Sequence, residues 1–205
     1  MSRLRLFSIL VSVILVTAAC GSRAPRPVFP PRLDLFQFGR VGLVKFVMED
    51  AEGTLDEFAT QRFAETVIDA QMGVEVLELG DQQEVLDQVG QSAMDRAALQ
   101  AISGEYDTPA IFVGEIVVSN IQPRASLGIP PRLRAEVTVE LVVRLYSGES
   151  GGTLWTRSAQ ATQTVAHLSL EGGRPSFGAQ DPEEAYGELV DYLIYEITHD
   201  LRPSR

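Results

Sequence analysis

The sequence predicts an α/β fold with a mixed five-stranded sheet and flanking helices. The first half of the sheet is built from βαβ units, and the second half consists of antiparallel hairpin strands. Two observations predict it. Strand-like apolar runs alternate with segments of helical periodicity as far as Gly104, and three strand-like segments then follow one another before a last helix. Alternating strands and helices are typical of parallel pairing, whereas successive strands joined by short turns pair antiparallel.

The first half is predicted to contain a strand over 41–48, a helix from Thr54 to Gly73, a strand over 74–79, and two helices over 81–90 and 92–104. The first strand is almost wholly apolar, as expected for a strand that is covered on both faces. Thr54 begins a capping box at the first helix, and Asp81 begins another at the second. Ser92 and Asp95 open the third helix.

The second half is predicted to contain strands over 110–119, 133–146 and 153–165, and a turn over 147–152 reverses the chain between the last two. Trp155 is expected in the core, because its strand faces the helices. The last helix begins at Asp181 and Pro182, a residue pair suited to a helix start. Its apolar stripe should dock on the sheet and consists of Leu189, Leu193, Ile197 and Leu201.

The first twenty residues are typical of a bacterial lipoprotein signal. Arg3 and Arg5 precede an apolar run over 6–16, and small residues then lead to Cys20, the only cysteine of the chain. This order describes an exported precursor, so we expect a signal peptide over 1–19 and a covalent lipid on Cys20. The alternative is a transmembrane anchor, but the run over 6–19 is shorter than the roughly 20 residues that span a bilayer.

Residues 20–38 are expected to carry the acylated cysteine and a proline-rich tether, and residues 39–205 to form a single periplasmic α/β domain. Four prolines lie between positions 25 and 31, a composition that favours an extended spacer. Gly21 and Ser22 follow the cysteine, where an aspartate would retain a lipoprotein on the inner membrane. We therefore expect attachment to the outer membrane, on its periplasmic face, through the acyl chains.

The charge of the chain excludes one class of partner. The chain has 17 basic and 28 acidic residues, a net charge of −11, and removal of residues 1–19 moves this value to −13. Nucleic-acid binding requires a concentrated basic surface, and the sequence has no run of lysine or arginine. Nucleic acid is therefore not an expected partner, and the folded domain is not expected to bind anionic lipid head groups.

The order of elements and several local motifs resemble a known superfamily. The motifs are VGLVKF at 41–46, QMG at 71–73, VEVLEL at 74–79, AIFVGEI at 110–116, LY at 145–146 and GTLW at 152–155. They resemble the curli-secretion-lipoprotein superfamily, which includes the curli export channel, the lipoprotein activators of penicillin-binding proteins and the N-terminal domain of the Tol-Pal propeller protein. The resemblance implies a non-enzymatic envelope protein. A non-pore member is expected, because the predicted loops 121–132 and 147–152 are too short for the two inserted hairpins of the channel.

Catalysis is not expected from the motifs of the chain. His167 and His199 are the only histidines and lack a metal-ligand spacing. Neither a nucleophile elbow nor a phosphate-binding glycine loop is present in the sequence, and an acylated Cys20 is not a nucleophile. We therefore expect no catalytic residue, no metal and no cofactor other than the lipid on Cys20.

An acidic cluster after the first predicted strand leaves two interpretations open. Glu49, Asp50 and Glu52 lie where α/β sheets often place ligand sites, so they could bind a cation or do acid–base work. Alternatively they form a solvated stretch before a helix N-terminus, whose dipole favours negative charge. We favour the second interpretation.

Four apolar residues in predicted loops are candidates for partner binding. They are Ile121, Leu127, Ile129 and Phe177. The alternative is that they fold back over an edge of the sheet. Together these observations predict an outer-membrane-anchored accessory or scaffold of a cell-envelope assembly that acts by protein–protein contact. The alternative function is a ring-forming secretion or transport-accessory lipoprotein, so formation of a homo-oligomer stays open.

Overall fold

Strands and helices alternate in the first half of the domain, and strands dominate the second. The computed structural model describes residues 31–49, 51–125, 133–166, 168–171, 174–177 and 182–203. In chain order the elements are β1 (Arg40–Val44), β2 (Val47–Glu49), β3 (Glu52–Gly53), α2 (Leu55–Ala70), β4 (Glu75–Gly80), α3 (Gln82–Gln88), α4 (Arg96–Tyr106), β5 (Ala110–Ala125), β6 (Leu133–Ser147), β7 (Thr153–Ala166), β8 (Leu168–Glu171), β9 (Arg174–Phe177), α5 (Pro182–Ile197) and the 3-10 turn η1 (Thr198–Leu201).

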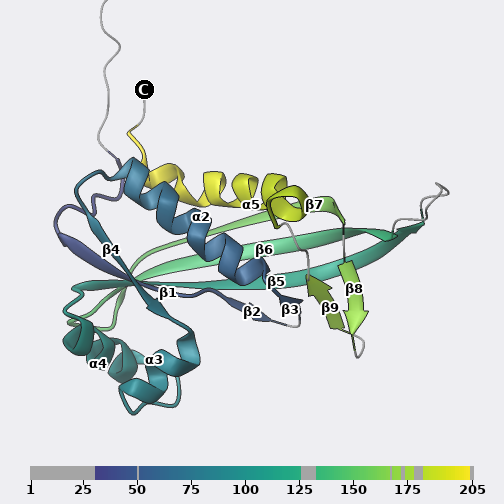
Figure 1. Ribbon diagram of the computed structural model, residues 1–205. Coiled ribbons are helices and arrows are strands. Elements are labelled where there is room, and N and C mark those ends of the chain that lie inside the picture. Colours follow the sequence, from purple (N-terminus) through teal and green to yellow (C-terminus); the bar gives the residue numbers. More distant parts are fainter. Residues whose placement is uncertain are drawn as a thin grey trace, which may run out of the picture. The chain divides into compact units, whose positions relative to one another are not determined.

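The main sheet has the strand order β4-β1-β5-β6-β7 (Figure 1). β1 pairs parallel with β4 and with β5, whereas β6 pairs antiparallel with both β5 and β7. The predicted α/β fold with a parallel first half and an antiparallel second half is therefore confirmed. The predicted first strand is broken at Lys45 and Phe46, and its second piece, β2, pairs with β5 as a sixth strand of the sheet.

The break in the first strand has a packing cause. Phe46 is fully buried, and a Cβ atom added at Gly114 would overlap its ring. The ring therefore occupies the space that a side chain on β5 would need. The N–H of Phe46 donates to Oγ1 of Thr60 on α2 at 2.9 Å instead of to a neighbouring strand.

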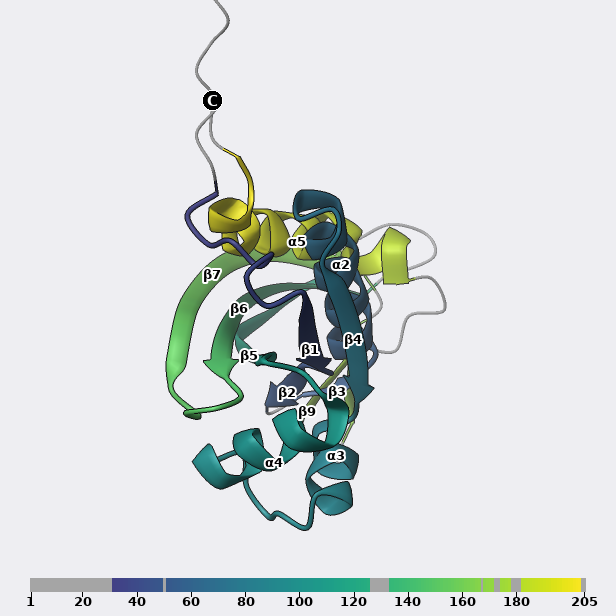
Figure 2. The same cartoon turned by 90° about the vertical axis from the view of Figure 1, so that its left-hand side faces the viewer.

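Helices cover both faces of the sheet, with α2 and α5 on one face and α3 and α4 on the other (Figure 2). The first face holds the larger core, in which successive ring centroids lie 5.1–6.2 Å apart. These rings belong to Phe46, Phe63, Phe112 and Trp155. The second core is smaller and consists of Val44, Val85, Leu99, Ile102 and Ile111.

The helices start close to the predicted positions, but the predicted side-chain capping bonds do not form at every start. Asp81 and Asp95 cap α3 and α4, since their carboxylates accept the N–H groups of Gln83 and Ala98 at 3.0 Å. Thr54 precedes α2 but makes no side-chain capping bond, so the predicted capping box is wrong there. Ser92 lies before α4, which also continues past Gly104 to Tyr106.

The second half contains two departures from the prediction. β5 continues to Ala125 instead of ending at 119, because its pairing with β6 resumes after an irregularity between Ser119 and Gln122. Beyond Val117, β5 pairs with β6 alone among the described strands, and a strand paired on one side tolerates Pro123. A small sheet of order β3-β9-β8 is a second unpredicted feature.

The last helix is the most accurately predicted element. All four residues of its predicted stripe are at most 3% exposed, although the last of them, Leu201, lies in η1 beyond the end of α5, and α5 packs against α2 and β7. Gln71, at the end of α2, then joins both ends of the domain, because its amide donates to the carbonyls of Leu33 and Leu201 and accepts the N–H of Leu35. None of the helices in the described ranges is long and apolar enough to cross a membrane.

Candidate functional site

A crevice lies beyond the carboxyl ends of β1 and β4, from which the chain continues to helices on opposite faces of the sheet. β1 leads through β2 and β3 to α2, which packs into the larger core, whereas β4 leads directly to α3, which packs into the smaller one. Such a switch point is the usual ligand position in α/β sheets. The crevice has a volume of about 440 Å³ and is lined by 46–48, 51–53, Asp56 and 81–83. We call it the switch-point crevice.

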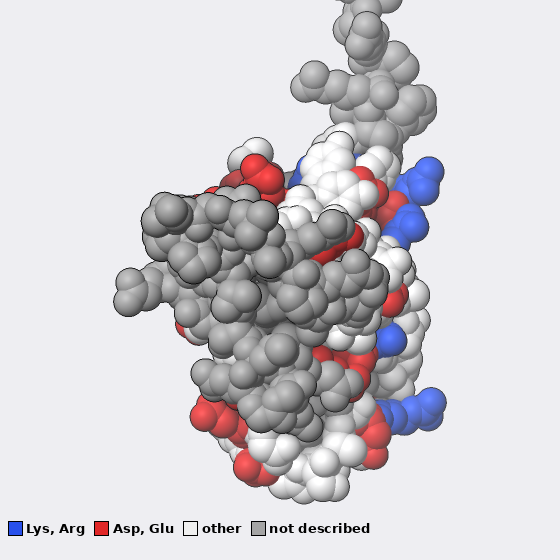
Figure 3. All heavy atoms as spheres, turned by 90° about the vertical axis from the view of Figure 1, so that its right-hand side faces the viewer, with Lys and Arg blue, Asp and Glu red and all other residues white. Residues whose placement is uncertain are grey.

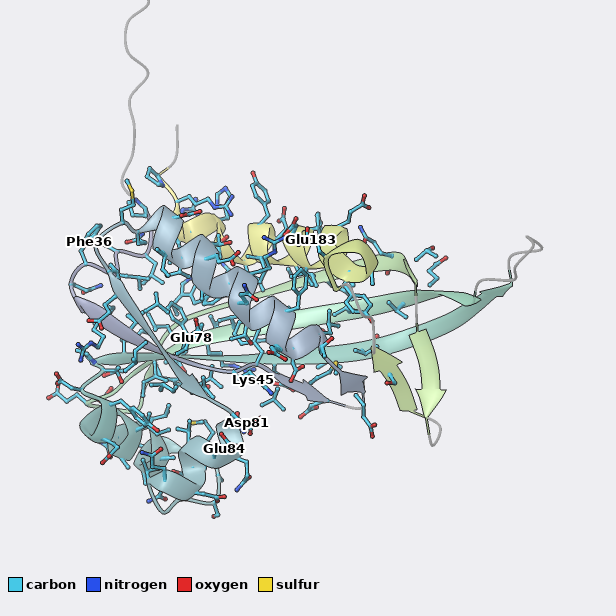
Figure 4. The ribbon with its side chains drawn as sticks, viewed as in Figure 1. Phe36, Lys45, Glu78, Asp81, Glu84 and Glu183 are labelled. Carbon is cyan, nitrogen blue, oxygen red and sulfur yellow. The ribbon has the colours of Figure 1, made fainter. Side chains whose placement is uncertain are left out.

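One lysine and two aspartates from three separate segments of the chain meet beside this crevice. Nζ of Lys45, the only lysine of the chain, lies 3.5 Å from Oδ2 of Asp56 and 3.3 Å from Oδ2 of Asp81. Figure 4 shows Lys45 and Asp81 close together below the middle of the sheet. The ammonium therefore bridges the first turn of α2 and the cap of α3.

The pair Lys45 and Asp81 is held in its charged form. Burial by itself would lower the pKa of Lys45, but the charge of Asp56 and the hydrogen bond and charge of Asp81 outweigh it and raise this pKa. The pKa of Asp81 is lowered, because the N–H of Gln83 and the Lys45 ammonium stabilise the carboxylate against the effect of burial. Neither group is tuned toward neutrality, as a general acid or base would be.

The acidic residues predicted near this place do not converge. Glu49 is exposed at the end of β2, and Glu52 is exposed on β3, where it lines the crevice. Asp50 lies outside the described residues. Within the described ranges no three His, Cys, Asp or Glu side chains are grouped so that they could hold a metal ion. Glu49 and Glu52 thus lie on two short strands, and both interpretations of the acidic stretch stay predictions.

The predicted partner-binding residues fall mostly beyond what the structure describes. Ile121 belongs to β5 and is not in a loop, which corrects the loop predicted over 121–132. Phe177 belongs to β9, where it pairs with Gly53 and Leu168. The side chains of both residues, and the whole of Leu127 and Ile129, lie outside the described part of the chain. Cys20 and His167 lie outside it as well, and His199 is exposed on η1.

An exposed apolar surface that the sequence analysis did not identify lies at the start of β4. Phe36 is 54% exposed, Ile68 47% and Met72 80%, and the Phe36 ring would lie 3.2 Å from a Cβ atom at Gly73. We call Phe36, Ile68 and Met72 the apolar end. Ile68 is an apolar residue of α2 outside its buried stripe, and Met72 follows the end of the helix; an apolar residue outside the stripe is the sequence signal that could have revealed this surface.

β4 itself is an open edge of the sheet. In the described part of the chain its backbone pairs with β1 alone. Glu75 and Glu78 are exposed on it, and Glu84 is exposed one turn into α3. Figure 4 shows Phe36, Glu78, Asp81 and Glu84 following the course of β4 from its start to the start of α3. We call Glu75–Gly80, Asp81 and Glu84 together the β4 edge.

Acidic side chains also dominate elsewhere. In the view of Figure 3 they are scattered over the visible described surface, whereas lysine and arginine gather along one side. This distribution agrees with the net charge of −11. A positively charged partner is therefore favoured over a negatively charged one on most of this surface.

No family model matches the chain, and no curated protein matches it. Among solved structures, the PelC dodecamer from Paraburkholderia phytofirmans is 11% identical, with a TM-score of 0.45 over 86% of this chain and 95% of that one. The LpoB C-terminal domain from Salmonella enterica is 16% identical, with a TM-score of 0.39 over 62% and 84%. Lipoprotein GNA1162 from Neisseria meningitidis is 19% identical, with a TM-score of 0.37 over 61% and 83%.

Of these three structures, the one from Neisseria meningitidis is named a lipoprotein. At such identities and TM-scores, no partner, activity or oligomeric state is transferred from them to this chain. Membership of the curli-secretion-lipoprotein superfamily therefore stays a prediction.

Proposed function

We propose that the chain is an outer-membrane-anchored periplasmic lipoprotein that acts without catalysis, as an accessory of a cell-envelope assembly, through protein–protein contact. The observation that carries this proposal is the signal-like segment over 1–20, which ends at the lone cysteine, Cys20. A thiol in this position is the group that lipid-transferring enzymes acylate. The proline-rich residues beyond it would let the domain reach into the periplasm by roughly 3 Å per residue.

The described surfaces support contact as the mode of action. The β4 edge offers unpaired backbone groups, and the apolar end offers exposed side chains next to it. Beside the switch-point crevice, Lys45 and Asp81 form an ion pair in which both groups stay ionised and their opposite charges balance. An interaction surface accounts for these features without a reaction.

A ring-forming secretion or transport-accessory lipoprotein is the second candidate. The observation in its favour is that β4 and β7 are the two terminal strands of the main sheet (Figure 2). Head-to-tail pairing of such edges generates rings when the rotation closes. An organic cargo gains no support from the enclosed apolar cavity between α2, α5 and the sheet, because this cavity has a volume of about 10 Å³, enough for one water molecule.

The anchor is tested by metabolic labelling with palmitate and by separating the inner and outer membranes on a density gradient. We expect labelled protein in the outer-membrane fraction, loss of label and membrane association in Cys20→Ser, and transfer to the inner membrane in Gly21→Asp. Label that persists in Cys20→Ser would contradict lipidation at this residue. Unchanged sorting of Gly21→Asp would contradict the argument from the residues that follow the cysteine.

The accessory role is tested by cross-linking in living cells, followed by mass spectrometry of what is attached to the tagged full chain. We expect a protein of an envelope machine that is recovered with the parent and lost in Cys20→Ser. A ladder containing only copies of this chain would refute the accessory role and support the ring-forming candidate.

A further inference from the structure

We propose that the β4 edge is the surface on which this chain takes up its partner, and that the partner contributes an extended segment rich in lysine or arginine, which joins the sheet as an additional strand. The inference rests on the proposed function, because it names the chemistry of the partner that an accessory protein would contact. The carrying observation is an open sheet edge with apolar side chains at one end and unpaired carboxylates along it.

The backbone of β4 has hydrogen-bonding groups to offer. The N–H of Glu75 donates to the carbonyl of Gly39, so this residue points toward β1. Backbone groups alternate in direction along a strand, and those of Val76 and Glu78 therefore point to the open side, where an edge strand presents unpaired N–H and C=O groups. Six residues span about 20 Å, enough for an added strand of similar length. Addition of an extended peptide to such an edge is an established mode of recognition.

The carboxylates of the edge select the charge of the occupant. Glu75 is paired with Arg40 at 2.8 Å, and Asp81 with Lys45 at 3.3 Å. Glu78 and Glu84 are exposed and have no ion-pair partner among the described residues. These two carboxylates lack a positive partner in the described part of this acidic chain. They favour a cationic segment, because opposite charges that face one another across paired strands attract.

The two ends of the β4 edge limit the position of the segment. The apolar end lies beside the turn that enters β4, and Met72 is 80% exposed there. At the other end, the switch-point crevice begins at Asp81. A segment lying along the edge would thus cover apolar side chains at the start of β4 and reach the crevice at its end.

A second copy of this chain is a poorer occupant of the same edge. Antiparallel pairing of β4 with the β4 of another copy would bring Glu75 and Glu78 of both copies together, and like charges that face one another across strands destabilise the pair. Pairing of β4 with β7 of another copy lacks this repulsion. That arrangement is therefore the competing outcome of the test.

The test measures binding of a fluorescent peptide to the full chain in detergent by anisotropy. The probe has eight residues, carries phenylalanine at both ends and alternates valine with lysine between them. Its twin is methylated at alternate backbone nitrogens, which removes the donors that pair with a strand. The protein variants are Glu78→Lys on the edge and, as a matched control, Glu188→Lys on an exposed position of α5.

We expect the parent and Glu188→Lys to bind the probe within twofold of one another, Glu78→Lys to bind about fivefold more weakly, and the methylated twin to lose binding to all three. Equal binding of the twin, equal effects of the two substitutions, or no binding of the probe would each overturn the proposal. Self-association of the parent that competes with the probe would assign the edge to a second copy and overturn it too. Cys20→Ser should bind the probe like the parent, so failure of the anchor and failure of the edge are distinguishable.

Discussion

Replacing Gln71 with leucine removes three hydrogen bonds that connect the two ends of the domain. Gln71 is 1% exposed, and its amide contacts the carbonyl of Leu33 at 3.1 Å, the carbonyl of Leu201 at 2.7 Å and the N–H of Leu35 at 3.2 Å. A net contribution of about 1 kcal/mol for each bond predicts a loss of roughly 3 kcal/mol in the free energy of unfolding. In a domain of this size that loss lowers Tm by roughly 6–12 °C.

Urea unfolding of the full chain, followed by circular dichroism, measures this loss. The matched control is Gln61→Leu in α2, since Gln61 is exposed and, among the described residues, its amide bonds only with the side chain of Glu65. We expect the control to stay within about 0.5 kcal/mol of the parent. If Gln71→Leu costs no more than Gln61→Leu, the three hydrogen bonds do not hold the ends of the domain together and the reasoning is refuted.

Three further substitutions test the packing and charge of the domain. Burial by itself would raise the pKa of Asp200, but hydrogen bonds from Arg157 and Trp155 and the charges of Arg157 and Arg32 outweigh it and lower this pKa. The ionised carboxylate therefore stabilises the fold fully above the pKa of an unfolded aspartate, about 4. This stabilisation is lost as pH falls through the pKa of Asp200 in the folded protein. Asp200→Asn should flatten the acid limb of stability against pH in urea titrations, and an unchanged limb would contradict this. Gly114→Ala should cost about 1–3 kcal/mol, because the Phe46 ring occupies the Cβ position, and a neutral effect in thermal unfolding would show that the ring moves freely. Gly104→Ala, exposed on α4 with no atom within 4 Å of the added Cβ, should instead stabilise by about 0.5–1 kcal/mol.

Elements with a strong local pattern could be predicted from the sequence. The stripe of the last predicted helix, which spans α5 and η1, recurs at helical spacing, and every one of its members is buried as expected. The alternating residues of β6 likewise face the core, from Val137 to Leu145. Patterns of this kind depend on neighbours within one segment, so one face of each element is identifiable before the fold is known.

The missed elements depend on residues far apart in the chain. β3 and β9 pair only because Glu52 and Ser176 are brought together, and neither strand is long enough to show a period. The break between β1 and β2 arises from Phe46 above Gly114. Short strands and local breaks are decided by such tertiary contacts, which no window of sequence contains.

The candidate site also combines features that the sequence shows with contacts that only the folded chain forms. Its acidic character beyond the first strand was visible in the sequence, and Glu52 does line the crevice. The bridge from Lys45 to Asp56 and Asp81 joins three separate segments of the chain and follows only from the folded arrangement. The apolar end was missed because the Phe36 ring is brought next to Gly73, 37 positions further along the chain, only by folding.

By itself the sequence determined the fold class, the order of nearly all the major elements, the buried faces of the long ones and the acidic charge of the chain. These properties are local or additive, and period, composition and charge are read without knowing which segments meet. The tertiary structure alone decided that β4 is an outer strand, that its carboxylates lie along an unpaired backbone, and that a crevice opens at its end. The reason is physical: an edge exists only where no other strand pairs, and strand order is set by the packing of α2, α3 and α4 on opposite faces of the sheet.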